Sequence, residues 1–310
     1  MEIIRSLEQL HKSPVPCVVA MGTFDGIHLG HQDVIAAAKR RAVKTGGRLA
    51  VFTFSNHPMT LIHPEQVPAS LLTEEQKYAF FEELGVDVLM DIRFDASVAR
   101  LEPETFLARL QELDYSCLAV GENFTYGRFG HGDVRTLAAS ASRMGFQLIV
   151  RPLVTLEGRV VSSTEIRSLI AAGDVELAGR MLGRCYSLTG RVVHGSERGR
   201  LLGFPTANME LDDLRAAVPL GGVYAVTVSA GGRQYGGMAN IGSNPTFGDV
   251  RRPRLETNIF GFSGDLYGSE LTVCFRSRIR GEVKFSGTEQ LKRQLETDRD
   301  EACRRLGLQL

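Results

Sequence analysis

The chain has 310 residues, of which 43% are hydrophobic and 23% charged, as in soluble globular proteins long enough for two domains. Its 36 Lys and Arg balance its 36 Asp and Glu, so no overall basic field indicates nucleic-acid binding. No apolar run approaches the roughly 20 residues of a membrane helix, and the N-terminus lacks the features of a signal peptide. We therefore expect a cytoplasmic protein that binds neither nucleic acid nor membrane, and the composition indicates no particular oligomeric state.

The cysteines are odd in number and widely separated along the chain. None forms the C-x-x-C pair that is typical of zinc sites and of thioredoxin-like redox sites. Reduced thiols are the rule in the cytoplasm, and we expect them at Cys17, Cys117, Cys185, Cys274 and Cys303.

The first half of the chain, up to about Gly183, alternates short apolar strands with helices. Strands that are apolar throughout and separated by helices indicate a parallel sheet covered on both faces. This is the doubly wound, Rossmann-like α/β class, which binds ligands beyond the carboxyl ends of its strands. The predicted strands are residues 17–24, 48–54, 86–92, 117–124 and 147–154, and the predicted helices are 32–44, 73–84, 103–113, 133–144 and 175–182.

After Arg184 the strands follow one another directly, and only one helix, at residues 288–306, ends the chain. Glycine pairs separate these strands, as turns of antiparallel hairpins do, and Ser286 with Glu289 has the spacing of a capping box. A small antiparallel β-barrel with a C-terminal helix fits best, so we expect domains of residues 1–183 and 184–310. The predicted strands are 186–195, 222–230, 233–242, 254–262 and 270–280, and the glycine pairs are 221–222, 231–232 and 236–237.

The stretch MGTFDGIHLGH, residues 21–31, lies between the first strand and the first helix. Gly22 permits a tight turn, and Gly30 permits the close approach of a ligand. The free N–H groups and the positive end of the helix dipole favour an anion such as phosphate. His28 and His31 add directed donors that can hold phosphate oxygens as negative charge builds in a transition state.

Other interpretations of the two histidines stay open at this point. His31 could cap the helix while His28 is an ordinary surface residue. A zinc site lacks a third ligand with suggestive spacing, because His57 and His63 are separated from the pair by a strand.

A second polar segment, VSSTEIR at residues 161–167, follows the last strand of the first half. Ser162 and Glu165 could form nothing more than a capping box. Ser163 and Thr164, however, place hydroxyls beside free N–H groups, and Arg167 supplies a forked cation suited to phosphate. The segment fits a helix cap and a phosphate site equally well.

Four motifs of the first half resemble the FMN adenylyltransferase (FAD synthetase) module of bacterial bifunctional riboflavin kinase/FAD synthetases. In chain order they are GTFDGIHLGHQ, TFSNHP, VGENFTYGR and SSTEIR. The resemblance implies that ATP adenylylates FMN, giving FAD and pyrophosphate without a covalent enzyme intermediate. It implies that His28 and His31 are catalytic and contact the ATP phosphates. Ser163, Thr164 and Arg167 would close over these phosphates from the other side. Asn123 would lie near the flavin. The ATP-binding residues that it further implies are Gly22, Phe24, Asp25 and Gly30.

One motif departs from the family. Ser55 and Asn56 stand before His57 where relatives more often have Glu-Pro, and the role of His57 stays open. The chemistry itself needs placement and charge stabilisation, with Mg²⁺ bound to ATP, because the FMN phosphate is already a nucleophile.

The barrel half contains GRVVHGSERGRLLGFPTANM, a Gly-rich stretch that could be a hairpin whose loop ends at Pro205. Thr206 and Asn208 nevertheless offer the hard oxygen ligands that Mg²⁺ accepts beside phosphate oxygens. Farther on, Glu256 lies within a strand pattern and faces away from its two neighbours. An isolated strand Glu is more often solvated than functional.

This half closely resembles the riboflavin kinase module, with PTAN as its most specific mark. The resemblance implies Mg²⁺-ATP binding by Thr206 and Asn208, and a catalytic Glu256 that takes the ribityl hydroxyl proton. It also implies an ATP flap from Gly195 to Gly203 and a flavin contact of Arg200. Asn258 stands where relatives often have His.

The whole resemblance implies a bifunctional enzyme with riboflavin, FMN, FAD and ATP as its partners. Riboflavin and ATP would give FMN and ADP, and FMN and ATP would give FAD and pyrophosphate. Two other hypotheses are an adenylyltransferase whose barrel is a flavin-binding or regulatory module, and a flavin-sensing or RNA-binding protein built on a degenerate enzyme. The presence of Thr206, Asn208 and Glu256 argues against the first. The neutral net charge and the complete histidine pair argue against the second.

Overall fold

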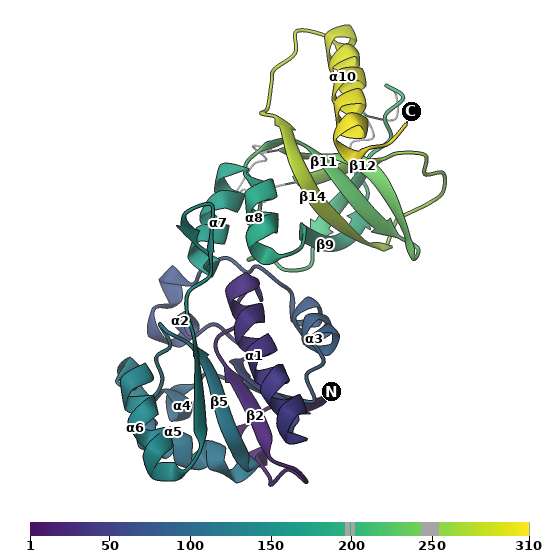
Figure 1. Ribbon diagram of the computed structural model, residues 1–310. Coiled ribbons are helices and arrows are strands. Elements are labelled where there is room, and N and C mark those ends of the chain that lie inside the picture. The colour runs from purple at the N-terminus through teal and green to yellow at the C-terminus, as the bar shows by residue number, and fades with distance from the viewer. Residues whose placement is uncertain (196–198, 200–201, 243–253, 310) are drawn as a thin grey trace. The chain divides into compact units, whose positions relative to one another are not determined.

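The computed structural model describes residues 1–195, 199, 202–242 and 254–309. The chain forms two compact units, shown in Figure 1, which are treated separately below. The first contains Met1–Pro68 and Leu72–Ser163, and the second contains Ala69–Leu71 and Thr164–Leu310. In the described ranges, no helix is long and apolar enough to cross a membrane.

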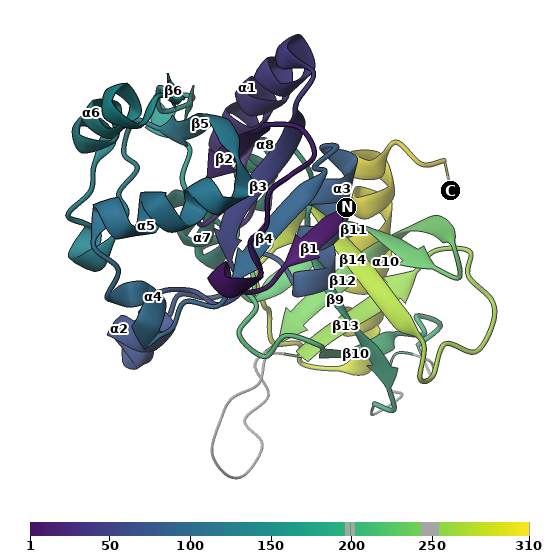
Figure 2. The same cartoon turned by 90° about the horizontal axis from the view of Figure 1, so that it is seen from below.

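A six-stranded, fully parallel sheet forms the centre of the first unit (Figure 2). Its strand order is β1-β4-β3-β2-β5-β6. From the central strand β2, the sheet continues through β3 and β4 on one side and through β5 and β6 on the other. This order confirms the doubly wound α/β class and puts the topological switch point between β2 and β5. The strands are β1 (Glu2–Ile4), β2 (Cys17–Met21), β3 (Arg48–Phe54), β4 (Val88–Ile92), β5 (Tyr115–Gly121) and β6 (Gln147–Arg151).

Helices cover both faces of this sheet because its central strands are apolar on both sides. Val18 and Ala20 of β2 pack with α1 and α3, whereas Val19 and Met21 pack with α5 and α6. The helices are α1 (Leu29–Thr45), α2 (Met59–Ile62), α3 (Glu74–Glu83), α4 (Ala96–Ala99), α5 (Pro103–Leu110) and α6 (Val134–Met144).

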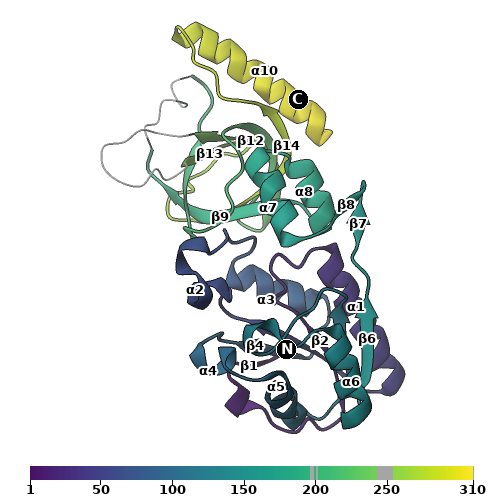
Figure 3. The ribbon, with the colours of Figure 1, turned by 90° about the vertical axis from the view of Figure 1, so that its left-hand side faces the viewer.

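The second unit is a closed barrel with strand order β10-β13-β12-β11-β14-β9, which confirms the predicted barrel (Figure 3). All of its neighbouring strands are antiparallel. Its strands are β9 (Tyr186–Val193), β10 (Ala207–Leu211), β11 (Gly222–Ala230), β12 (Arg233–Gly242), β13 (Arg254–Ile259) and β14 (Glu270–Arg280), and its helices are α7 (Ser163–Ala172), α8 (Val175–Leu182) and α10 (Thr288–Leu306).

Three local predictions need correction. The Gly236–Gly237 pair lies inside β12, where a Cβ at Gly237 would come within 2.6 Å of the Asn258 carbonyl, so close strand approach explains these glycines. The strand β10 was missed because it directly follows a proline-containing loop. The expected capping box of α10 is absent, because Gly287 is the N-cap and Ser286 bonds to the Gln290 side chain instead.

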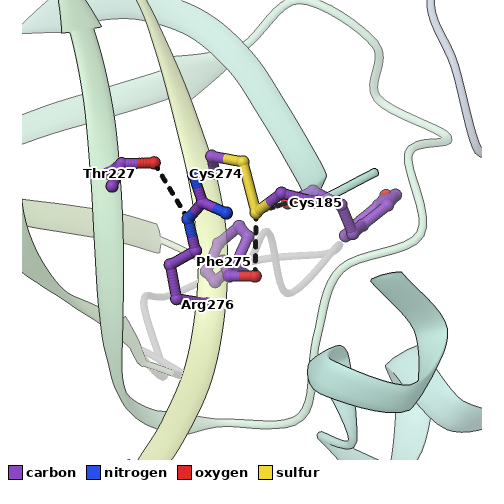
Figure 4. Close-up of a disulfide and its surroundings, with 6 residues drawn as sticks. Cys185, Thr227, Cys274, Phe275 and Arg276 are labelled. Carbon is purple, nitrogen blue, oxygen red and sulfur yellow. Dashed lines mark hydrogen bonds between the residues drawn. A yellow bond between two sulfur atoms is a disulfide. The ribbon is translucent and has the colours of Figure 1, made fainter. Parts of the chain in front are cut away.

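A disulfide joins Cys185 and Cys274 in the barrel (Figure 4). Cys185 directly precedes β9, and Cys274 lies in β14, which pairs with β9. This pairing brings the two Cα atoms to 5.8 Å, well within the usual range for a disulfide. The expectation of reduced thiols is wrong for this pair. The two cysteines are 89 residues apart in the sequence, and only the pairing of β9 with β14 brings them close together. Cys17, Cys117 and Cys303 are free and buried.

A buried ion pair fastens α10 to the barrel. Asp298 of α10 is 1% exposed, and both of its carboxylate oxygens accept hydrogen bonds from Arg280 at 2.7–3.0 Å. Gln294 donates a further hydrogen bond to the same carboxylate at 2.9 Å. The helix thereby covers an apolar cluster that contains Phe204, Met238 and Ala302.

Removing this carboxylate should destabilise the barrel. We expect Asp298→Ala to lower the free energy of unfolding by about 3 kcal/mol, because the Arg280 guanidinium loses its buried partner. The matched control is Glu301→Ala on the same helix, since Glu301 pairs with Arg304 and Arg305 at the surface. Denaturant unfolding followed by circular dichroism measures both variants, and an equal loss in the two would contradict the assignment.

Candidate functional site

A cavity of about 470 Å³ opens in the first unit at the carboxyl ends of β2 and β5. The segments that directly follow these two strands, residues 22–24 and 123–127, form part of its wall, as the topology predicts. The wall is mainly apolar, with the imidazoles of His28 and His31 among its polar groups. Aromatic rings in the wall suit a flat, conjugated ligand, and they belong to Phe24, Phe52, Phe54, Phe94, Phe106, Phe124 and Tyr126.

The two histidines form one stacked unit at the start of α1. Their ring centroids are 3.6 Å apart and their planes differ by 18°. His28 is the N-cap of α1, and its Nδ1 accepts the backbone N–H of His31 at 3.4 Å. The capping interpretation was therefore right about the helix but assigned the cap to the wrong histidine. Because Nδ1 accepts, a neutral His28 carries its proton on Nε2.

A left-handed turn aims this histidine pair. Phe24, Gly26 and Ile27 all have positive φ angles, of 47°, 80° and 41°, a conformation that costs energy for Phe and Ile. The turn is held by Thr53 of β3, whose hydroxyl donates to the Thr23 carbonyl at 2.8 Å. Phe24 is buried and packs edge-on against His31, with ring centroids 5.2 Å apart.

The predicted glycines are needed for close packing at the turn. A Cβ at Gly22 would lie 3.2 Å from the Phe24 ring, and one at Gly30 would lie 3.3 Å from the His28 ring. Both residues line the cavity. A larger residue at either position would shift a ring that shapes the site.

The second motif meets the first beside the cavity. Ser163 Oγ donates to the Asp25 carbonyl at 2.8 Å, and Val161 and Ser162 line the cavity. The predicted Thr164 and Arg167 belong to the second unit. Arg167 Nε donates to the Ala69 carbonyl at 2.6 Å.

Asn123 lines the cavity after β5, and Asn56 is a supporting residue to which the sequence analysis assigned no role. Asn56 accepts the Phe94 N–H at 2.7 Å and donates to the Phe94 carbonyl at 3.1 Å, which fixes one aromatic wall. A polar residue at the end of the apolar strand β3 was the available signal. His57 Nδ1 accepts the Met59 N–H at 3.2 Å, and the adjacent Pro58 lines the cavity.

A buried charge cluster supports the same end of the sheet. Asp91 of β4 is 1% exposed and accepts hydrogen bonds from Lys77 at 3.2 Å and from Tyr78 at 2.7 Å. Lys77 also donates to the Phe54 carbonyl at 2.8 Å. Burial lowers the pKa of Lys77 against the opposing effect of Asp91, and burial together with the Asp91 hydrogen bond raises the pKa of Tyr78. The sequence did not reveal this cluster, because its members meet only through packing of α3 on the sheet.

The barrel carries a second row of candidate residues across three strands. Glu256 of β13 lies directly opposite Asn208 of β10 and Asn240 of β12, so the three side chains share one face. All three are partly exposed. Leu255 and Thr257 are buried and face the other way, as predicted for neighbours of Glu256. Asn240 was missed, although an Asn in the otherwise apolar stretch MANIG was a usable signal.

Gly195, two residues after β9, packs against the same row. A Cβ at this position would meet the Asn208 side-chain amide, so a larger residue would displace that amide. Gly203 has a φ of 83°, which glycine adopts without steric cost. Arg200 lies outside the described residues. Thr206, at the entrance to β10, is partly exposed like Asn208.

An α/β unit with a cavity at its switch point, joined in one chain to a closed antiparallel barrel, defines a two-module enzyme of the nucleotide-binding type. Residues 10–165 match the family model of FAD synthetase, and residues 182–306 match that of riboflavin kinase. The chain belongs to the family of bifunctional riboflavin kinase/FMN adenylyltransferases, which confirms the resemblance found in its motifs.

Curated relatives match over nearly the whole chain. The bifunctional riboflavin kinase/FMN adenylyltransferase of Bacillus subtilis is 40% identical over 93% of this chain and 92% of its own length. That of Pseudomonas fluorescens is 37% identical over 96% of each chain. A crystal structure described as a macrolide-efflux protein from Streptococcus pneumoniae is 33% identical, has a TM-score of 0.89, and is matched over 96% of this chain and 97% of its own.

Substitution of His28 can separate its capping role from any role with a ligand. We expect His28→Ala to destabilise the first unit by about 1 kcal/mol, because the cap of α1 is lost. His28→Asn should retain most of that stability, since Asn is a good N-cap residue. Thermal unfolding measures both variants, and equal stability of His28→Ala and the unchanged protein would contradict the capping assignment.

Proposed function

We propose that residues 1–183 carry the FMN adenylyltransferase of this bifunctional enzyme and residues 184–310 its riboflavin kinase. The observation that carries the proposal is that each motif set forms its own constellation: the histidine pair at a cavity, and Glu256 beside Asn208 on the barrel. This boundary follows the end of α8 at Leu182 and the left-handed Gly183, although α7 from Thr164 onward and α8 belong to the same compact unit as the barrel. The riboflavin kinase model begins at residue 182.

In the first site, an FMN phosphate oxygen attacks the α-phosphorus of ATP. A new P–O bond forms there, the bond to the bridging oxygen breaks, and pyrophosphate leaves with the electron pair. No base is required, because the phosphate nucleophile is already ionised. His28 and His31 stabilise the charge on the phosphate oxygens, with His28 donating through Nε2. Gly22, Phe24 and Asp25 belong to the turn that positions the two histidines, and Gly30 lies in the first turn of α1.

The aromatic wall supports the flavin end of the same proposal. Rings of Phe54, Phe106 and Tyr126 offer flat apolar surface for the isoalloxazine system. Asn123 adds polar atoms on the same wall. Ser163 joins the second motif to the turn by its hydrogen bond to the Asp25 carbonyl, and Thr164 and Arg167 lie farther along α7.

In the second site, Glu256 takes the proton of the ribityl hydroxyl as that oxygen attacks the γ-phosphorus of ATP. The new P–O bond forms there, the bond to the bridging oxygen breaks, and ADP leaves with the electron pair. A neutral alcohol is a poor nucleophile, so a base or orienting carboxylate is needed here. Thr206 and Asn208 would hold Mg²⁺ with the ATP phosphates, since hydroxyl and amide oxygens are ligands that this hard cation accepts. Bound Mg²⁺ supplies charge neutralisation at the transferred phosphate.

The cytoplasm supplies ATP to both reactions, and we place the protein there. A flavin-binding barrel without kinase activity is the competing hypothesis, and the cross-strand pairing of Glu256 with Asn208 argues against it.

A product assay tests the proposed division. Purified protein incubated with riboflavin, ATP and Mg²⁺ should form FMN and then FAD, separated by chromatography. FMN without FAD would contradict the two-step proposal, and the absence of FMN would contradict the kinase.

Two sets of variants test whether the sites are independent. Glu256→Gln should lower FMN formation by about a hundredfold or more, because the proton acceptor is lost, while added FMN still becomes FAD. His28→Asn combined with His31→Asn should lower FAD formation by about a hundredfold and spare FMN formation. Loss of both activities in either well-folded variant would refute the division.

The magnesium assignment has a readout that does not depend on turnover. We expect ADP to bind the Glu256→Gln protein at least about tenfold more tightly with Mg²⁺ than with EDTA, because the cation bridges the nucleotide to Thr206 and Asn208. Calorimetric titration measures the difference. Equal affinities under the two conditions would contradict the assignment.

A further inference from the structure

Asn258 makes a buried hydrogen bond that none of the assigned roles explains. It lies two residues after Glu256 on β13 and therefore on the same face of that strand. Its side chain is largely buried, with 7% of the residue exposed. Its Nδ2 donates to the Pro205 carbonyl at 2.6 Å, which is the carbonyl directly before Thr206.

This hydrogen bond acts where the strand ladder stops. The pairing of β10 with β13 runs from Met209 opposite Leu255 to Ala207 opposite Thr257. Pro205 precedes the first pair and has no N–H to donate, so its carbonyl is the only backbone group through which it can be held. The Asn258 side chain thus holds Pro205 to β13 at a point beyond the last backbone pair of the two strands.

A second anchor holds Phe204, the residue directly before Pro205. Phe204 is 6% exposed and packs in the cluster with Met238 and Ala302 beneath α10. Its N–H donates to the Gly199 carbonyl at 2.9 Å. Met238 lies directly opposite Asn258 across β12 and β13. The Asn258 amide therefore holds Pro205, and the packing of the Phe204 ring holds the residue before it. Together these two contacts fix the position of the backbone that leads into Thr206.

We propose that Asn258 is a positioning residue of the kinase site, which sets the Thr206–Asn208 segment in place relative to Glu256. The inference rests on the proposed kinase function and adds a residue to it. One strand then carries both the base and the hydrogen-bond donor that holds the Mg²⁺-ATP segment. Phosphoryl transfer depends on such placement, since an error of about 1 Å between reacting groups can cost about a hundredfold in rate.

A donor deletion tests the proposal. Asn258→Leu keeps the volume of the side chain but removes the hydrogen bond to Pro205. We expect the affinity for Mg²⁺-ADP to fall about tenfold and the KM for ATP in the riboflavin kinase reaction to rise by the same factor. The KM for riboflavin and the conversion of FMN to FAD should not change. Asn258→His, which keeps an N–H donor, should restore most of the ADP affinity.

The matched control is Thr257→Val, a change of similar shape at a buried position on the opposite face of the same strand. It should leave the Mg²⁺-ADP affinity unchanged. Unchanged ADP affinity in Asn258→Leu, an equal loss in Thr257→Val, or a rise confined to the KM for riboflavin would overturn the proposal. If Asn258→Leu does not fold, Asn258→Ala is judged by the same criteria.

The test separates this proposal from the proposed function itself. If the unchanged protein forms no FMN from riboflavin, the kinase assignment fails. The calorimetric comparison of Mg²⁺-ADP binding between Asn258→Leu and Thr257→Val still decides whether Asn258 positions the nucleotide segment.

Discussion

Hydrogen-bond register between strands is the constraint on which both candidate sites depend. In the first unit, the parallel alignment of β2 with β5 brings the turn after Met21 and the segment after Gly121 to one cavity. In the barrel, the alignment of β10, β13 and β12 puts Asn208, Glu256 and Asn240 in one row. A slip of one residue would turn Glu256 toward the buried face. The chemistry of each half therefore rests on main-chain pairing.

In the proposed division, the two halves use ATP differently because their nucleophiles differ. An FMN phosphate needs no base, and the first unit accordingly offers stacked imidazoles, a strained turn and an aromatic wall. A ribityl hydroxyl needs a proton acceptor, and the barrel offers a carboxylate between two amides. Supporting residues such as Asn56, Asp91 and Asn258 bind main-chain or side-chain groups behind these sites. They fix geometry and do not themselves have to touch a substrate.

Much of the fold was predictable because its signals are local. Apolar strands separated by helices indicated the parallel sheet, and consecutive strands after Arg184 indicated the barrel. The histidine pair and the PTAN stretch were found from short motifs in the same way. The errors arose where the decisive contact is distant in sequence. The glycine pair predicted a turn at Gly237. The residue instead lies within a strand, where the close approach of the Asn258 carbonyl leaves no room for a Cβ.

The sequence by itself determined the two architectures, the family, and the motif residues around His28 and Glu256, since these depend on periodicity and on residues close together in the chain. Only the tertiary structure decided that His28 rather than His31 caps α1, that Ser163 reaches Asp25, and that Cys185 meets Cys274. It also decided that Asn258 holds the Pro205 carbonyl. Each of these contacts requires a strand register or a packed turn, which no short stretch of sequence specifies.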